Sequence, residues 1–133
     1  NSSDLILDVG ANLGWYAINI SKINSDIKVF AFEPDDDNFR LLNDNITLNN
    51  STNIISINKA VTAGQAGKVV LYKYPDKNLG RHSLLKTAGL EQKQTLVKTI
   101  SIDDFILTTN LNGNNIKLLK IDVEGYEYQV LLG

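Results

Sequence analysis

Acidic residues stand at three places where an apolar run ends, and glycines accompany them at two of these places. Residues 8–14, with the sequence DVGANLG, follow the apolar run 5–7. Residues 32–34 (FEP) and 119–127 (LKIDVEGYE) close two further apolar runs, and both carry acids. A carboxylate accepts hydrogen bonds from hydroxyl groups or pairs with a cation, and a glycine lets a ligand lie against bare backbone. The spacing therefore indicates a site for a small polar ligand.

The first of these places combines a strand, a glycine-bearing turn and a helix start, as nucleotide-binding folds do. The turn lacks the middle glycine of the dinucleotide fingerprint GxGxxG, and Asp8 precedes Gly10. A carboxylate there would repel a diphosphate, but it suits a ligand with an ammonium, a sulfonium and ribose hydroxyls. This chemistry favours S-adenosylmethionine. We expect the cofactor turn to include Gly10, Asn12 and Gly14. Asp8 is expected to hold the ammonium, with an ion pair to Lys120 as the alternative.

Two further contacts with the nucleoside are predicted. Glu33 lies about one strand and one helix after the glycine turn, where an acid accepts hydrogen bonds from both ribose hydroxyls. Helix capping is the alternative role for Glu33, and a ribose contact does not distinguish methyl transfer from hydride transfer. Asn58, or the backbone at Ala60, is expected to meet the adenine. Asn58 is as readily explained as a turn former.

The acids after the last apolar run are expected near the reacting methyl group. Asp122 and Glu124 are two residues apart, so their side chains point the same way if the strand continues through them. We expect one of them to orient an acceptor hydroxyl or to take its proton. Pairing with Lys120 and helix capping are the alternatives. His82 is the only histidine and suits a general base near neutral pH, but a loop histidine is more often solvated.

The aspartates at 35–37 raise the question of a metal site. A helix start explains them better, because Pro34 favours a first helical turn and acids complement the helix dipole. The chain has no cysteine, so thiolate zinc ligands are excluded. We predict no metal.

The three acid-bearing blocks, 8–14, 32–34 and 119–127, together resemble the signature blocks of the FkbM-type methyltransferase family. They occur in the family's order and span nearly the whole chain. The resemblance implies a Rossmann-like, S-adenosylmethionine-dependent methyltransferase that acts most often on a hydroxyl oxygen, here of a sugar, glycan or small metabolite. Ser83 and Leu84 match a Ser-Leu element of the family, whereas His82 is not carried over from it.

These side chains need strands that end at one edge of a sheet. Apolar runs predict parallel strands at 5–9, 27–32, 54–57 and 116–123. Helices are predicted after Gly14, Pro34 and Ser101 and from residue 127, with Trp15 and Tyr16 packed on the sheet. We expect an α/β fold of the Rossmann-like class I methyltransferase type with strand order 3-2-1-4. Segments 68–74 and 95–100 are predicted to add an antiparallel β element.

The length of 133 residues indicates one domain, 1–133. A net charge of −2 does not favour nucleic acid or an anionic membrane as a partner. No apolar run reaches the roughly 20 residues of a membrane span, so we expect a cytoplasmic protein. The chain has no methionine and ends at Gly133 in a helical pattern. We therefore expect a C-terminally incomplete domain with strands missing, whose fourth strand is an open edge through which oligomers could form.

Two other functions remain open from the residues. One is an NAD-type oxidoreductase domain, which the missing middle glycine and Asp8 disfavour. The other is a non-catalytic fragment of a larger enzyme.

Overall fold

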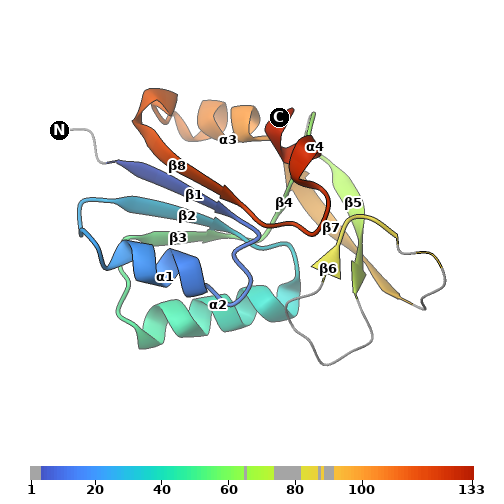
Figure 1. The fold of residues 1–133 in the computed structure, drawn as a ribbon, viewed down its shortest axis with the longest axis horizontal. Coiled ribbons are helices and arrows are strands. Elements are labelled where there is room, and N and C mark those ends of the chain that lie inside the picture. The colour runs from blue at the N-terminus through green and yellow to red at the C-terminus, as the bar shows by residue number, and fades with distance from the viewer. Residues whose placement is uncertain (1–3, 65, 74–81, 87, 89–91) are drawn as a thin grey trace.

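The computed structural model describes residues 4–64, 66–73, 82–86, 88 and 92–133. Within these residues, a parallel sheet forms the centre of a mixed α/β fold (Figure 1). Its strand order is β3-β2-β1-β8, with β1 at Leu5–Val9, β2 at Lys28–Phe32, β3 at Ile54–Ile57 and β8 at Ile116–Ile121. This is the predicted order of the four strands, and it agrees with a Rossmann-like fold.

Helices cover both faces of this sheet. Helices α1 (Trp15–Ser21) and α2 (Asp36–Leu48) lie on one face, and α3 (Ile102–Thr109) and α4 (Glu127–Leu131) lie on the other (Figure 1). Because successive strand residues face opposite sides, β1 divides its side chains between two cores. Its residues 5, 7 and 9 pack with Phe105 of α3. Ile6 packs with Ala17 and Ile18 of α1.

Helix starts follow the predicted capping chemistry. The carboxylate of Asp35 accepts hydrogen bonds from the N–H groups of Asp37 and Asn38, both at 3.1 Å, and so caps α2. The hydroxyl of Ser101 accepts the N–H of Asp104 at 3.0 Å and caps α3. The aspartate run at 35–37 is therefore a helix start. Elsewhere in the chain, a 3-10 turn at Gly113–Asn115 leads into β8.

The prediction that the aromatic pair of α1 packs on the sheet is wrong. The side chain of Trp15 is 75% exposed and that of Tyr16 is 53% exposed. The helix buries Ala17, Ile18 and Ser21 instead. At helical spacing these three residues define the sheet-facing side, which turns Trp15 outward.

A second, mixed sheet lies beside the carboxyl ends of the parallel strands (Figure 1). Its order is β4-β7-β5-β6, with β4 at Ala60–Val61, β5 at Lys68–Lys73, β6 at His82–Ser83 and β7 at Lys93–Ile100. Strands β5 and β7 pair antiparallel from Lys68↔Lys98 to Lys73↔Lys93, as predicted. The parallel pairing of β4 with β7 was not expected. That this sheet is an addition to the family's fold, and that further strands are missing, remain predictions.

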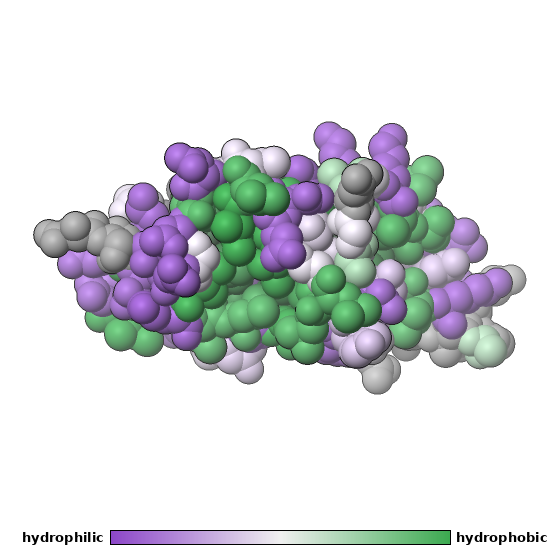
Figure 2. Space-filling view, turned by 90° about the horizontal axis from the view of Figure 1, so that it is seen from above, coloured by the Kyte–Doolittle hydropathy of each residue, from purple (hydrophilic) through white to green (hydrophobic). Residues whose placement is uncertain are grey.

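Strand β8 forms one edge of the parallel sheet. Among the described residues it pairs only with β1, and Leu118 in the middle of it is 43% exposed. Figure 2 shows the molecule from above, where apolar side chains gather between hydrophilic ones.

In the described part of the chain, no helix combines the length and the apolar character needed to cross a membrane.

Candidate functional site

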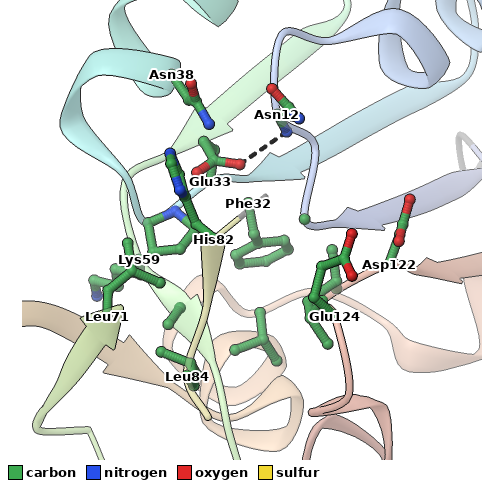
Figure 3. A pocket seen from close by; sticks show the side chains of 16 residues that line it. Asn12, Phe32, Glu33, Asn38, Lys59, Leu71, His82, Leu84, Asp122 and Glu124 are labelled. Carbon is green, nitrogen blue, oxygen red and sulfur yellow. Dashed lines mark hydrogen bonds between the residues drawn. The ribbon is translucent and has the colours of Figure 1, made fainter. Parts of the chain in front are cut away.

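A cleft lies at the carboxyl ends of the parallel strands, between them and the second sheet (Figure 3). The empty space in it, with its open mouth included, is about 650 Å³. Its lining residues are Val9, Gly10, Asn12, Phe32, Glu33, Pro34, Asn38, Lys59, Ala60, Val61, Leu71, His82, Leu84, Asp122, Val123 and Glu124. Seven predicted site residues are among them: Gly10, Asn12, Glu33, Ala60, His82, Asp122 and Glu124. Asp8, Gly14 and Asn58 do not line the cleft.

Glu33 lines this cleft and is almost fully buried, with 5% of its surface exposed. One carboxylate oxygen accepts the N–H of Asn12 at 2.8 Å, and the other accepts the N–H of Asp35 at 2.9 Å. Burial raises the pKa of Glu33 from its ordinary 4.5 to about 7, and the two N–H donors offset only part of the rise. The carboxylate thus ties the glycine turn to the start of α2 while it lines the cleft.

The backbone of the glycine turn is hydrogen-bonded within the chain. The N–H groups of Gly10 and Ala11 both donate to the carbonyl of Phe32, at 3.0 and 2.9 Å, and the N–H of Asn12 donates to Glu33. These N–H groups face the end of β2 and Glu33, so this turn does not present the row of free amides that a pyrophosphate needs.

Asn12 offers a polar atom to the cleft. It has a left-handed backbone, with φ at 51°, and lines the cleft beside Glu33 (Figure 3). Its carboxamide oxygen is buried and has no hydrogen-bond partner among the described residues. Since a buried acceptor without a partner is costly, this oxygen suits a ligand that donates a hydrogen bond, such as an ammonium or a hydroxyl.

Gly10 allows the turn to lie directly on the end of β8. A Cβ at this position would stand 2.0 Å from the carbonyl oxygen of Asp122, and the φ of Gly10 is +78°. The N–H of Asp122 donates to the carbonyl of Val9 at 3.0 Å, which continues the sheet pairing to the cleft. Glycine is therefore required here for close approach as well as for conformation.

Asp8 is not at the cleft, so the prediction that it meets a ligand ammonium is not supported. It lies on the α1 face of β1, fully buried, and forms an ion pair with Lys120 at 3.0 Å. Burial raises the pKa of Asp8, and the nearby ammonium of Lys120 offsets part of that rise. Lys120 also donates to the carbonyl of Gly10 at 3.2 Å. Asp8 and Lys120 thus support the glycine turn on the side away from the cleft. This ion pair is the alternative role that the sequence analysis gave for Asp8.

Asn58 and Gly14 also have structural roles. The carboxamide of Asn58 donates to the carbonyls of Glu33 and Pro34, at 3.1 and 3.3 Å, so it forms the turn after β2 and does not line the cleft. A Cβ on Gly14 would stand 2.5 Å from the Cδ1 of Leu42, so this glycine permits close packing of α1 and α2.

The acids after β8 lie on a loop, not on an extended strand. Strand β8 ends at Ile121, and Glu124 has a left-handed φ of 51°. The expectation that Asp122 and Glu124 align through strand alternation is therefore wrong in its premise. Both side chains nevertheless line the same side of the cleft (Figure 3). A non-glycine residue held at positive φ is uncommon and often marks a functional position.

Two neighbouring elements hold this loop. The hydroxyl of Ser83 in β6 donates to the carbonyl of Glu124 at 2.9 Å, and it accepts the N–H of Leu85. The carboxylate of Glu127 accepts the N–H of Gly125 at 3.1 Å. The N–H of Glu127 itself and, next to it, the N–H of Gly125 lower the pKa of the Glu127 carboxyl. The second sheet and α4 together fix where the two acids stand.

On the opposite side of the cleft, His82 lies beside the start of α2. Its Nε2 is 4.0 Å from a carboxylate oxygen of Asp35, which also forms an ion pair with Lys73. Burial alone would raise the pKa of Asp35, but Lys73 and the N–H of Asn38 outweigh it and hold that pKa below its ordinary value. This cluster fastens β5 and β6 of the second sheet to α2.

Sequence reasoning did not assign four further residues to the cleft: Asn38 of α2, Lys59 in the turn before β4, Leu71 of β5 and Leu84 just after β6. Leu71 and Leu84 come from segments whose pairing joins distant parts of the chain. The predicted antiparallel pair had offered the only available signal for Leu71.

The sequence matches the family model described as "Methyltransferase FkbM domain" over residues 8–133. The chain belongs to the FkbM methyltransferase family. The chain is 31% identical over 131 residues to the hexuronic acid methyltransferase AglP of Haloferax volcanii, and this match covers 98% of this chain and 49% of that protein. It is 25% identical over 157 residues to the methyltransferase sdnD of Sordaria araneosa, covering 99% of this chain and 61% of that protein. This FkbM chain thus spans about half of one curated relative and three-fifths of the other.

Proposed function

We propose that this chain forms the donor-binding part of an S-adenosylmethionine-dependent methyltransferase that methylates an oxygen atom of a sugar or similar small acceptor. The observation that carries the proposal is Glu33, a buried cleft-lining acid one strand and one helix after the glycine turn. Family membership supports methyl transfer as the reaction. When bound, S-adenosylmethionine supplies an electrophilic methyl group on a sulfonium sulfur.

The residues of the cleft fit such a donor. The carboxylate of Glu33 can accept from both ribose hydroxyls, since each oxygen has a second lone pair besides the one its N–H donor uses. With Asp8 behind the turn, the other cleft-lining carboxylates of the described residues are Asp122 and Glu124. The buried carboxamide oxygen of Asn12 can receive the ammonium, and the two acids can balance the positive charge of the sulfonium.

The same two acids favour a hydroxyl acceptor. A hydroxyl can donate a hydrogen bond to Asp122 or Glu124 and pass its proton to one of them as the oxygen–methyl bond forms. A carboxylate acceptor would be repelled by both. The relative from Haloferax volcanii is named for a hexuronic acid, which carries hydroxyls as well as a carboxylate. We therefore propose a carbohydrate hydroxyl as the methyl acceptor.

Calorimetry on the full-length protein tests the donor. S-adenosylhomocysteine should bind, NAD should not, and Glu33→Ala should weaken S-adenosylhomocysteine about tenfold or more, because the ribose hydroxyls lose their acceptor at a cost of roughly 1–3 kcal/mol. Asp36→Ala removes an exposed acid from the same helix start and is the matched control. Binding of NAD instead, or equal affinity in the Glu33 variant, would contradict the proposal.

Turnover tests the acceptor side. Asp122→Asn in the full-length protein should lower kcat on the true acceptor much more than it weakens donor binding, because the amide neither takes a proton nor carries charge. Unchanged turnover would leave Asp122 with a structural role.

A further inference from the structure

The second sheet closes one end of the cleft with apolar side chains. Ala60 and Val61 of β4 and Leu71 of β5 line that end, and each is at most 3% exposed. Leu84, just after β6, lines it as well. A flat apolar group that enters this end would be shielded from water on several sides.

His82 belongs to this end of the cleft. Its side chain is 14% exposed and stands 4.0 Å from the carboxylate of Asp35, whose N–H is bonded to Glu33. In Figure 3, His82 lies on the side of Glu33 and Asn38, whereas Asp122 and Glu124 lie on the opposite side. The only histidine is therefore separated from the acids that would meet the acceptor.

The position of Glu33 gives the cleft a direction, and this step rests on the function proposed above. If Glu33 holds the ribose, the methionine half of the donor extends toward the glycine turn and the acids after β8. The base, attached to the other side of the ribose, then extends toward the second sheet. An aromatic base has an apolar face for stacking and a polar edge, and this end offers apolar walls together with Asn38 and Lys59.

We propose that His82 is a positioning residue for the adenine of the donor, with its ring packed against the base plane. Asp35 and Lys73 hold the ring by fastening β5 and β6 to the start of α2. On this proposal the second sheet supplies one wall of the nucleoside site. His82 then acts in donor binding and not as the general base that its residue type had suggested.

Calorimetry with two ligands, using the full-length protein, tests the role of His82. His82→Ala should weaken S-adenosylhomocysteine and 5′-methylthioadenosine by the same factor, about tenfold, because both carry the adenosine half. His82→Phe should restore most of the affinity, and His82→Leu, which fills space without an aromatic face, should not. At saturating donor, kcat should change less than threefold in all three variants.

Lys98→Ala, at an exposed position of β7 in the same sheet, is the matched control and should leave both affinities unchanged. Equal affinity in the wild type, alanine and leucine variants would overturn the inference alone, as would a collapse of kcat with unchanged affinity. Should the alanine variant not fold, the comparison of leucine with phenylalanine decides the matter. A wild-type protein that binds neither ligand would overturn the proposed function as well.

Discussion

At the scale of single residues, the carboxyl group of Glu33 has two roles. Its oxygens hold the backbone of Asn12 and Asp35, and the same oxygens face the cleft. A charged acid serves both purposes, because it accepts hydrogen bonds only. Its burial opposes that charge. The proposed ribose site is therefore sensitive to pH near neutrality.

The free energy of unfolding should also depend on pH because of Glu33. The unfolded chain releases the Glu33 proton near pH 4.5, whereas the folded chain retains it to about pH 7. Between these values the folded state binds more protons, so the free energy of unfolding falls as pH rises, by roughly 3 kcal/mol in all, and the loss is complete above pH 7. Glu33→Gln should flatten this slope in urea unfolding between pH 4.5 and 8. Parallel curves for the two proteins would assign the slope to other groups.

Gly10 and Gly64 offer a matched pair for testing close approach. Both have positive φ, at 78° and 85°, but a Cβ on Gly10 meets the carbonyl of Asp122 at 2.0 Å, and one on Gly64 meets nothing within 4 Å. Gly64→Ala should cost only the backbone strain of about 1–2 kcal/mol. Gly10→Ala should cost clearly more and weaken S-adenosylhomocysteine, measured by chemical unfolding and calorimetry. Equal losses of stability would mean that the turn relaxes away from β8.

The sequence predicted residue positions better than it predicted residue roles. Glu33 and Gly10 follow strand ends directly, where chain geometry leaves few directions, and both line the cleft. Asp8 lies within β1, so strand alternation turns it toward α1, where it meets Lys120. The side-chain amide of Asn58 donates hydrogen bonds to backbone carbonyls, so it does not line the cleft. A pattern of residue types does not reveal which partner a polar side chain will take.

At the scale of elements, the two-residue strand β6 connects the two sides of the cleft. His82 faces the start of α2, and Ser83 bonds the loop that carries Glu124. The loop geometry thus depends on a strand from the other sheet. Displacement of this short strand would move the nucleoside wall and the acids together.

Two buried serines test this dependence. Ser83→Ala removes the hydrogen bonds to Glu124 and Leu85 and should cost about 1 kcal/mol of stability. It should also lower kcat about tenfold, because misplaced groups lose the benefit of orientation. Ser101→Ala removes the cap of α3, away from the cleft lining, and should cost a similar stability without a change in kcat. Equal kcat in both variants would show that the loop keeps its position without Ser83.

Elements with long local patterns were predictable, and short ones were not. The four parallel strands are mostly apolar, and their order matches the prediction. Strands β4 and β6 have two residues each, so no periodicity marks them, and their pairing depends on contacts with distant segments. The end of β8 at Ile121 was also missed, because the left-handed turn at Glu124 comes from contacts with Ser83 and Glu127.

At the scale of the whole molecule, the edge of β8 is a place where another chain could pair. Its outer side has no partner strand among the described residues, and the side chain of Leu118 in this strand is 43% exposed. The 133-residue chain alone should associate with rising concentration in sedimentation, and Leu118→Lys should reduce this, since charges protect edge strands. Leu48→Lys, at a similarly apolar exposed site on α2, is the control and should have no effect. Equal association of all three chains in sedimentation would show that the chains do not associate through this edge.

The internally bonded glycine turn also bears on how fast a donor is captured. The N–H groups of residues 10–12 have their partners within the chain, so the turn is ordered before any ligand arrives. A ligand that meets a preformed site loses little free energy in ordering it, and no conformational step delays the encounter. Association should then appear in stopped-flow measurements as a single phase whose rate rises linearly with donor concentration. Differences in affinity between donor and product would arise in how long each stays bound.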